Sequence, residues 1–254
     1  KRGMTGSPTA KNPLDLYSQC EFLKDGLLGF SSYYSFQARY AKLRPLTREG
    51  FRQAMIPYDY QNLAELFNKV KPFSYRKIKE ECLDLPPKIH TRRELSMSTQ
   101  QLEIYNQLKK YARAVLLDKK TSYTNKLTEI LRLHQVTCGF FKSDTGEIQE
   151  LNNPKLKELV NILEEMDGKV IIWANYIYNI EQIIKTLKDK FPFDRTVSVY
   201  GAVSVADRDK AVENFQKDPY TKFLVGNPAT GGYGLNLTEA DTVIYYSNSY
   251  DLTV

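Results

Sequence analysis

From residue 153 onward, short apolar runs alternate with amphipathic segments. Short strands are predicted at residues 170–174, 196–199, 223–225 and 242–246, where most of the residues are apolar. The amphipathic segments repeat apolar positions every three or four residues, which predicts helices at residues 153–163, 177–187 and 206–215. Strands and helices that alternate in this way are joined by right-handed crossovers, so the pattern predicts an α/β fold with a parallel sheet.

The first part of the chain has a different pattern. From Pro13 to about Lys110 it predicts helices with breaks. One short amphipathic helix is predicted over residues 62–70, because four apolar side chains fall on one face: Leu63, Leu66, Phe67 and Val70.

The middle of the chain predicts two longer helices. The first begins at Ser98, and we expect Ser98 and Gln101 to cap it reciprocally. The second is predicted near residues 125–136. Residues 140–150 are predicted to form a loop with a turn at 144–146.

Composition and cysteine usage narrow the class of protein. The chain has 254 residues, 42% hydrophobic and 26% charged, which is ordinary for a globular protein. It has no apolar run of about 18 residues, so we expect no membrane partner. The cysteines are Cys20, Cys82 and Cys138, an odd number without a closely spaced pair. They predict reduced thiols, no structural zinc and an intracellular location, either cytoplasmic or nucleoid-associated.

Charge and histidines add little by themselves. The formal net charge of +6 and the pI of about 9.0 permit a polyanionic partner without requiring one. His90 and His134 are isolated from other residues at metal-ligand spacing, so we assign no metal site.

The segment from residue 225 to 246 carries the main chemical hypothesis. Gly231, Gly232 and Gly234 follow a predicted strand and let the backbone approach a ligand closely. Loops of this kind at strand ends in parallel α/β sheets bind nucleotides and phosphates. A tight turn that needs glycine for steric reasons remains the alternative, because short glycine patterns are weakly specific.

Several stretches, in the same order along the chain, resemble the Swi/Snf-type DNA-dependent ATPases of helicase superfamily 2. The most informative is Gly231–Ile244, which resembles motif V of the second RecA-like lobe. Thr5–Thr9 and residues 12–17 are similar to motif III and the helix that follows it. Residues 71–79 and 84–88 are similar to the linker between the two lobes. Residues 169–174 are similar to motif IV, and Gly201, Arg208 and Phe215 have the spacing of the helix after motif IV. The C-terminal sequence Tyr246–Asp251 resembles helicases of phages and mobile elements.

The resemblance implies an architecture. It is an α/β fold whose RecA-like parallel-sheet lobe, the C-terminal helicase domain, follows a mainly helical region and a remnant of the first RecA-like lobe. We expect the remnant with a helical protrusion over residues 1–95, a helical linker over 96–152, and the second lobe over 153–254, ending before motif VI.

The resemblance also implies roles for individual residues. Coupling of nucleotide state to lobe movement would fall to Thr5, Gly6 and Ser7, although a tight Gly-Ser-Pro turn is the alternative. Contacts to DNA would come from Asn175, Tyr176, Gly201, Thr230, Gly231, Gly232, Arg76 and Lys77. Contacts to the nucleotide would come from Gly234 and Asn236.

Some of these roles have competing explanations. Arg76 and Lys77 fit a solvated basic face equally well, and we favour a structural role for Arg208. Where relatives often carry Ser or Thr before the glycines, this chain has Asn227 and Pro228, and Thr230 is the substitute we expect for the lost hydroxyl.

Hydrolysis of ATP needs a phosphate cradle and a magnesium ligand. The only Gly-Lys pair, Gly168–Lys169, is followed by Val170 and precedes a strand, so it is not a phosphate-binding loop. The family has these elements before motif III, and its arginine motif after motif V. We therefore expect an inactive C-terminal portion of a translocase that uses ATP and Mg²⁺ only as a full-length protein. Its partners would be double-stranded DNA and the missing N-terminal RecA-like lobe. A non-catalytic nucleic-acid-binding or regulatory module is the alternative.

Overall fold

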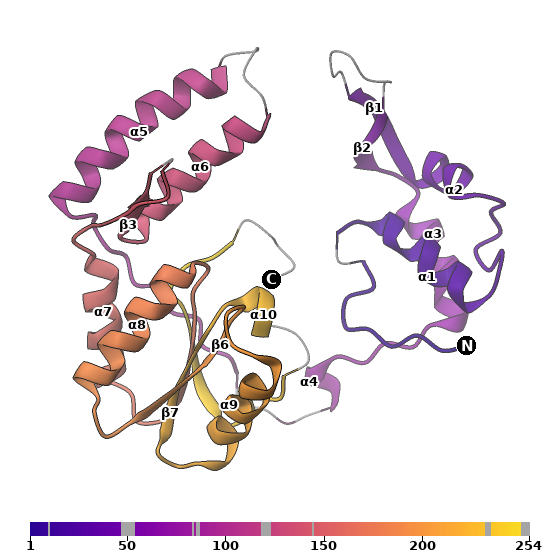
Figure 1. Ribbon diagram of the computed structural model, residues 1–254. Helices are drawn as coiled ribbons and strands as arrows, with labels where there is room; N and C mark the ends of the chain where they lie inside the picture. Colours follow the sequence, from indigo (N-terminus) through magenta and orange to yellow (C-terminus); the bar gives the residue numbers. More distant parts are fainter. Residues whose placement is uncertain are drawn as a thin grey trace. The chain divides into compact units, whose positions relative to one another are not determined.

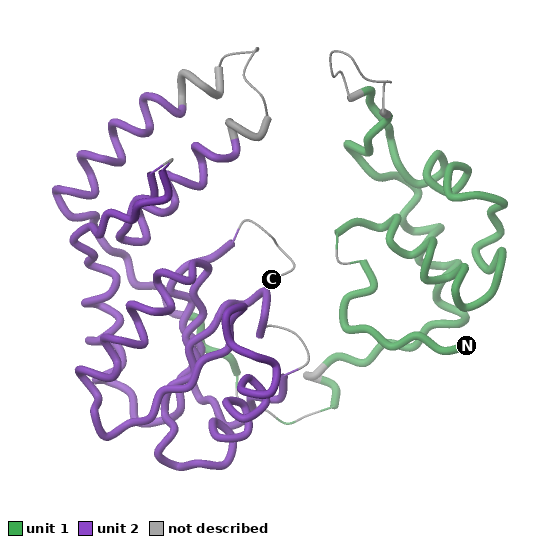
Figure 2. Tube along the Cα trace, in the orientation of Figure 1, with its two compact units in different colours: residues 1–90, 253 green, residues 91–252, 254 purple. Residues whose placement is uncertain are grey.

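The computed structural model describes residues 1–9, 11–46, 54–82, 84, 87–117, 123–143, 145–231 and 235–249. The chain divides into two compact units, residues 1–90 and residues 91–252 (Figure 2). Each unit has a hydrophobic core of its own.

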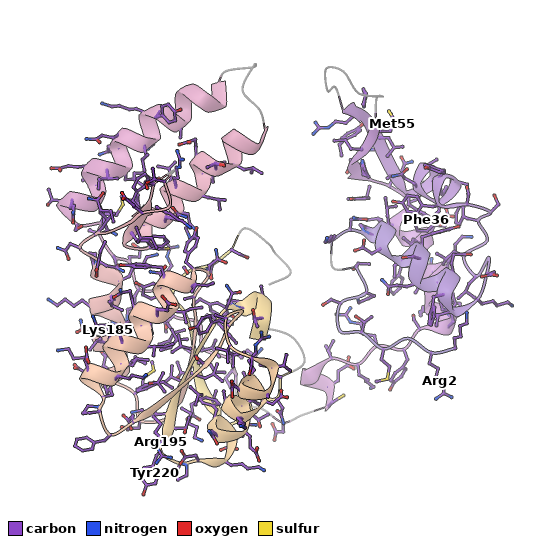
Figure 3. All side chains as sticks on the ribbon, viewed as in Figure 1. Arg2, Phe36, Met55, Lys185, Arg195 and Tyr220 are labelled. Carbon is purple, nitrogen blue, oxygen red and sulfur yellow. The ribbon has the colours of Figure 1, made fainter. Side chains whose placement is uncertain are left out.

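The first unit is mainly helical (Figure 1). Its elements are η1 (Pro13–Asp15), α1 (Leu16–Leu23), α2 (Tyr33–Tyr40), β1 (Ala41–Leu46), β2 (Ala54–Tyr60), α3 (Leu63–Val70), η2 (Lys71–Phe73) and α4 (Lys79–Cys82). Phe36 and Tyr40 are fully buried at its centre, where Phe36 contacts Tyr17 and Phe30 edge-on or tilted (Figure 3). Aromatic packing of this kind adds to the stabilisation from burial alone.

The prediction for this unit is confirmed for the helices and wrong for β1 and β2. These strands form an antiparallel hairpin in which Leu43 faces Pro57 and Pro45 faces Met55. A proline in each strand hid the pattern, because proline removes a ladder hydrogen bond and argues against a strand. Helix α3 forms where it was predicted, although Leu66 is its only fully buried side chain and Phe67 remains 65% exposed.

The second unit begins with two long helices, α5 (Thr99–Leu117) and α6 (Tyr123–Thr137). The predicted capping box is confirmed: the Ser98 amide donates to Gln101 Oε1 at 3.0 Å, and the Gln101 amide donates to Ser98 Oγ at 3.2 Å. Gln101 is also buried, and its Nε2 donates to the carbonyl of Val136 at 2.9 Å. One side chain therefore caps α5 and ties it to the end of α6.

The loop predicted at residues 140–150 is instead a short antiparallel hairpin. Strands β3 (Phe140–Lys142) and β4 (Ile148–Glu150) pair Phe140 with Glu150. Strands this short show no alternation of apolar and polar residues that a sequence pattern can detect. The predicted turn falls between them, and its first residue, Asp144, lies outside the described residues.

The predicted parallel sheet is confirmed. Its strands are β5 (Lys169–Trp173), β6 (Arg195–Val199), β7 (Thr221–Gly226) and β8 (Ala240–Tyr245), in the order β6-β7-β5-β8, and all neighbours are parallel. In the register, Ile172 lies between Val225 of β7 and Ile244 of β8. The nearly continuous burial along β5 and β7 is typical of strands that are covered on both faces of a sheet.

Helices cover the two faces of this sheet (Figure 1). Helices α7 (Pro154–Glu164) and α8 (Ile177–Lys190) bury Leu159, Leu163 and Ile180 against one face. Helix α9 (Val205–Lys217) buries Phe215 and Ala211 against the other. Full burial of each large apolar side chain stabilises the fold by about 1.5–3 kcal/mol.

Candidate nucleic acid and nucleotide site

The predicted site residues of the second unit gather at one edge of the sheet. Because all the strands are parallel, the segments that follow them leave from the same, carboxyl edge. Asn175 and Tyr176 follow β5, Gly201 follows β6, and Thr230 and Gly231 follow β7. The structure therefore brings together predicted DNA-contacting residues from three separate segments.

Asn227 links these segments and was missed as a site residue. Its Nδ2 donates to the carbonyl of Asn175 at 2.8 Å, and its Oδ1 accepts from the amide of Ala229 at 2.8 Å. Its own amide donates to the carbonyl of Val199 at the end of β6. Asn227 thus joins the ends of β5, β6 and β7, and its side chain satisfies an amide at the start of the short helix α10 (Pro228–Gly231). An asparagine followed by proline is a sequence pattern of helix starts.

Ser247 is a second residue that the sequence did not single out. It is buried, and its Oγ accepts from the amide of Asn175 at 2.8 Å. Next to it, the Tyr246 amide donates to the carbonyl of Trp173 at 2.9 Å. The loop after β5 is therefore held from β7 by Asn227 and from β8 by Ser247.

The glycines of the loop after β7 have different surroundings. A Cβ on Gly231 would lie 2.8 Å from Cη2 of Trp173 and 3.2 Å from Cγ1 of Val199, so packing alone requires glycine there. A Cβ on Gly201 would meet nothing within 4 Å. Gly232 and Gly234 lie outside the described residues. At Gly231 the steric alternative accounts for the residue without a ligand.

Asn236 and Thr230 lie on either side of those glycines. Asn236 is exposed between Leu235 and Leu237, which pack against the core on the α9 side of the sheet. Its amide group therefore points away from the core and offers one acceptor and two donor hydrogens to a ligand. Thr230 is half-buried, and its amide donates to the carbonyl of Asn227 at 3.0 Å.

Tyr176 is held by the helical part of the second unit. Its hydroxyl lies 2.8 Å from Nδ1 of His134 on α6, and its ring meets Phe140 edge-on with the centroids 5.3 Å apart. Burial, with a smaller effect of the Lys155 charge, lowers the pKa of His134. Asn179, in the first turn of α8, donates to the carbonyl of Cys138 at 2.9 Å. These contacts connect α6 to the carboxyl edge of the sheet.

Arg208 has a structural contact. Its Nε donates to the carbonyl of Val203 at 2.8 Å, and a terminal nitrogen lies 3.5 Å from the carbonyl of Gly201. The guanidinium therefore braces the turn between β6 and α9 through carbonyl groups. In both contacts the partner of Arg208 is a backbone carbonyl and not an acidic side chain.

The remaining predicted residues lie in the first unit. The Ser7 amide donates to Thr5 Oγ1 at 3.1 Å, which closes a local turn around Gly6. Arg76 and Lys77 are exposed, and Lys77 lies 3.6 Å from the carboxylate of Glu81. Residues 1–90 contain 15 Lys and Arg against 9 Asp and Glu, so this unit carries the entire formal charge of +6. An excess of this kind attracts polyanions.

Two further observations concern the part of the chain that the structure describes. Within it, no helix is both long and apolar enough to cross a membrane. The same residues contain no group of three His, Cys, Asp or Glu side chains arranged to hold a metal ion.

Two family models match the chain. The SNF2-related domain matches residues 3–141, and the helicase conserved C-terminal domain matches residues 154–254. The phage or mobile-element origin suggested by the C-terminal sequence is not supported by these matches.

Individual relatives cover almost the whole chain. "TATA-binding protein-associated factor MOT1" of Saccharomyces cerevisiae is 29% identical over 98% of this chain, and "Uncharacterized ATP-dependent helicase MG018" of Mycoplasma genitalium is 26% identical over 96%. The chain spans only 16% and 22% of the lengths of these two relatives. Among solved structures, the "Sulfolobus solfataricus SWI2/SNF2 ATPase core in complex with dsDNA" is similar with a TM-score of 0.55 and 26% identity, over 96% of this chain and 51% of that chain.

These matches confirm the expected architecture: a parallel RecA-like lobe that follows a mainly helical region. The SNF2-related model alone covers more than half of the residues. The chain belongs to the SNF2-related family of helicase-like proteins, and it continues from the SNF2-related domain into the helicase C-terminal domain.

Proposed function

We propose that this chain is the part of a Swi/Snf-type DNA-dependent ATPase that couples nucleotide state to movement along duplex DNA. The observation that carries the proposal is the gathering of Asn175, Tyr176, Gly201 and Thr230 at the carboxyl edge of the parallel sheet. Ligands of open α/β sheets bind at this edge. Family membership supports ATP as the fuel, because one relative is named as an ATP-dependent helicase.

Duplex DNA is the proposed partner, and its phosphate backbone is the proposed point of contact. A solved relative is a complex with double-stranded DNA. Asn175, Tyr176 and Thr230 carry neutral donors that suit phosphate oxygens, and Arg76 and Lys77 on the first unit supply exposed positive charge. Contacts of this kind hold DNA without reading its sequence, as a translocase requires.

ATP and Mg²⁺ are proposed as cofactors of the whole ATPase. In this chain, the exposed amide of Asn236 suits a nucleotide, and Thr5, Gly6 and Ser7 are proposed to transmit nucleotide state through their short turn. We likewise propose the division into a first-lobe remnant at 1–95, a linker at 96–152 and a second lobe at 153–254, with the N-terminal RecA-like lobe as partner.

DNA binding tests the proposal directly. Fluorescence anisotropy with a labelled duplex of random sequence should give weak binding that falls steeply between about 50 and 200 mM salt, because each phosphate contact releases counterions. The variants R76Q and K77Q should each lower the salt slope by about 1 if the side chain meets a phosphate. Lys185, an exposed lysine on α8, provides the matched control in K185Q. Binding that ignores salt, or equal slopes for all three variants, would contradict the proposal.

Turnover separates the motor from a non-catalytic module. We expect no DNA-stimulated ATP hydrolysis from the 254-residue chain alone, and stimulated hydrolysis from the whole protein. In the whole protein, N236A should lower turnover more than DNA affinity, because the proposed partner of Asn236 is the nucleotide. A whole protein that binds duplex DNA but never hydrolyses ATP would favour the non-catalytic module instead.

A further inference from the structure

The backbone pairing of the central strand β5 ends just before Asn175. In the part of the chain that the structure describes, the last backbone bond toward β8 runs from the Tyr246 amide to the carbonyl of Trp173, at 2.9 Å. At Asn175 the partners are side chains instead: its amide donates to Ser247 Oγ, and its carbonyl accepts from Asn227 Nδ2, each at 2.8 Å. Side chains from the segments after β7 and β8 therefore fix both peptide groups of Asn175 while the chain turns into α8.

These bonds leave the side chain of Asn175 as its point of contact with a ligand. The residue is half-buried, and its side-chain amide makes no hydrogen bond to any other described residue. The amide nitrogen carries two donor hydrogens, which suit phosphate oxygens because such oxygens only accept. In the proposed function, on which this inference rests, the Asn175 side chain donates to a phosphate of DNA.

Ser247 is the buried support of this arrangement. The residue is only 4% exposed, so loss of its hydroxyl would leave the Asn175 N–H facing a buried position without an acceptor. The preceding residue, Tyr246, is also buried, and its hydroxyl accepts from Asn153 Nδ2 at the start of α7, at 2.6 Å. Strand β8 and helix α7 thus hold Ser247 in place, and the loop after β5 takes its position from Ser247.

We propose that Ser247 is a positioning residue for DNA binding: by accepting the Asn175 amide, it holds the loop after β5 so that the Asn175 side chain meets a DNA phosphate. Without this acceptor, the Asn175 amide must turn toward water to find a partner, and its side chain turns with it. Hydrogen bonds weaken steeply as their angle departs from linearity, so a small rotation loses the phosphate contact.

Variants of the 254-residue chain test the proposal. N175A removes the proposed contact, S247A removes its support, and the double variant S247A/N175A completes a mutant cycle. S247T keeps a hydroxyl acceptor. Thr221 supplies the matched control, because it is a buried residue at the opposite, amino edge of the sheet and its hydroxyl donates to Asp218 Oδ2 at 2.7 Å. T221V removes that hydroxyl. Affinity for a labelled duplex of random sequence is measured by anisotropy, and folding is checked by thermal melting.

N175A should weaken binding about tenfold, the scale of a hydrogen bond to a charged group. S247A should weaken it about threefold to tenfold, and the double variant should bind no more weakly than N175A, because both changes act on one contact. S247T should bind within about twofold of the parent chain. T221V should lower the melting temperature about as much as S247A, by about 2–6 °C, and leave affinity unchanged. The salt slope should stay constant throughout, because no charge is removed.

The possible failures separate the levels of the argument. A parent chain without salt-dependent binding overturns the proposed function. A neutral N175A beside a normal parent overturns the phosphate contact of Asn175 and this inference with it. The positioning role alone is overturned if N175A is weak and S247A normal, if their effects add, or if T221V binds as weakly as S247A. A folded S247T that binds as weakly as S247A has the same meaning. If S247A does not fold, S247C replaces it in the cycle, since sulfur is a weak acceptor.

Discussion

Gly231 gives the sharpest test of packing at the edge of the sheet. A methyl group there would lie 2.8 and 3.0 Å from two ring carbons of Trp173 and 3.2 Å from Val199. Trp173 and Val199 are both buried, so neither side chain can move aside into solvent. We therefore expect the substitution G231A to destabilise the second unit.

The expected size follows from two opposing effects. Overpacking a filled core costs about 1–3 kcal/mol. The backbone of Gly231 has no positive φ angle, so alanine can adopt the same conformation. Replacing glycine by alanine lowers the entropy of the unfolded chain, which raises the free energy of unfolding by about 0.4–1 kcal/mol. The free energy of unfolding should therefore fall by about 1–2 kcal/mol, which lowers the melting temperature by about 3–6 °C for a unit of this size.

Urea denaturation and thermal melting measure the change, and G201A is the matched control. A Cβ at Gly201 would meet nothing within 4 Å, so its stability should change by no more than about 0.5 kcal/mol. In the background of W173L, which lacks the two ring carbons, G231A should cost less than in the parent chain. If G231A melts normally but no longer binds DNA, the packing argument is wrong and the backbone of Gly231 faces a phosphate.

Two further predictions concern other contacts. N227A removes one hydrogen bond to the Asn175 carbonyl and another from the Ala229 amide. The free energy of unfolding measured in urea should therefore fall by about 1–3 kcal/mol. Unchanged stability would show that the loops after β5 and β7 do not depend on the Asn227 side chain. Arg39 and Tyr40 donate to Glu65 and lower its pKa below the ordinary 4.5. A lowered pKa in the folded state gives stability above the unfolded pKa that is lost as pH falls through the folded value. The parent should therefore melt above E65Q at pH 7, and this difference should vanish in acid; a difference that persists at low pH would rule out the carboxylate as its source.

The sheet and its helices were predictable because their apolar periods are local. The central strands β5 and β7 are runs of mostly consecutive apolar residues. Asn153 before Pro154 marks the start of α7, where the Asn153 side chain accepts from the Lys155 amide. The β1–β2 hairpin was not predictable in the same way. Its prolines resemble breaks between helices, so the sequence pattern did not indicate strands there.

The candidate site was predictable only as a set of segments. Position after a strand and resemblance to helicase motifs singled out Asn175 and Tyr176. The roles of Asn227, Ser247 and His134 arise from hydrogen bonds across the fold, at sequence separations that no periodicity covers. Overall composition did not show where the net positive charge lies along the chain. The division into two units assigns all of this net charge to residues 1–90.

The strand order has a consequence for how the second unit folds. Strand β5 is central, yet both of its partners lie later in the chain, because Trp173 pairs with Gly226 and with Tyr245. During synthesis this apolar strand leaves the ribosome before either partner exists. Helices α5 and α6, which are neighbours in sequence, can pair early, since local contacts form fastest. Strand β5 keeps an unpaired apolar edge until β7 and β8 have been synthesised. It is therefore the segment of the nascent chain most exposed to aggregation and to chaperone binding.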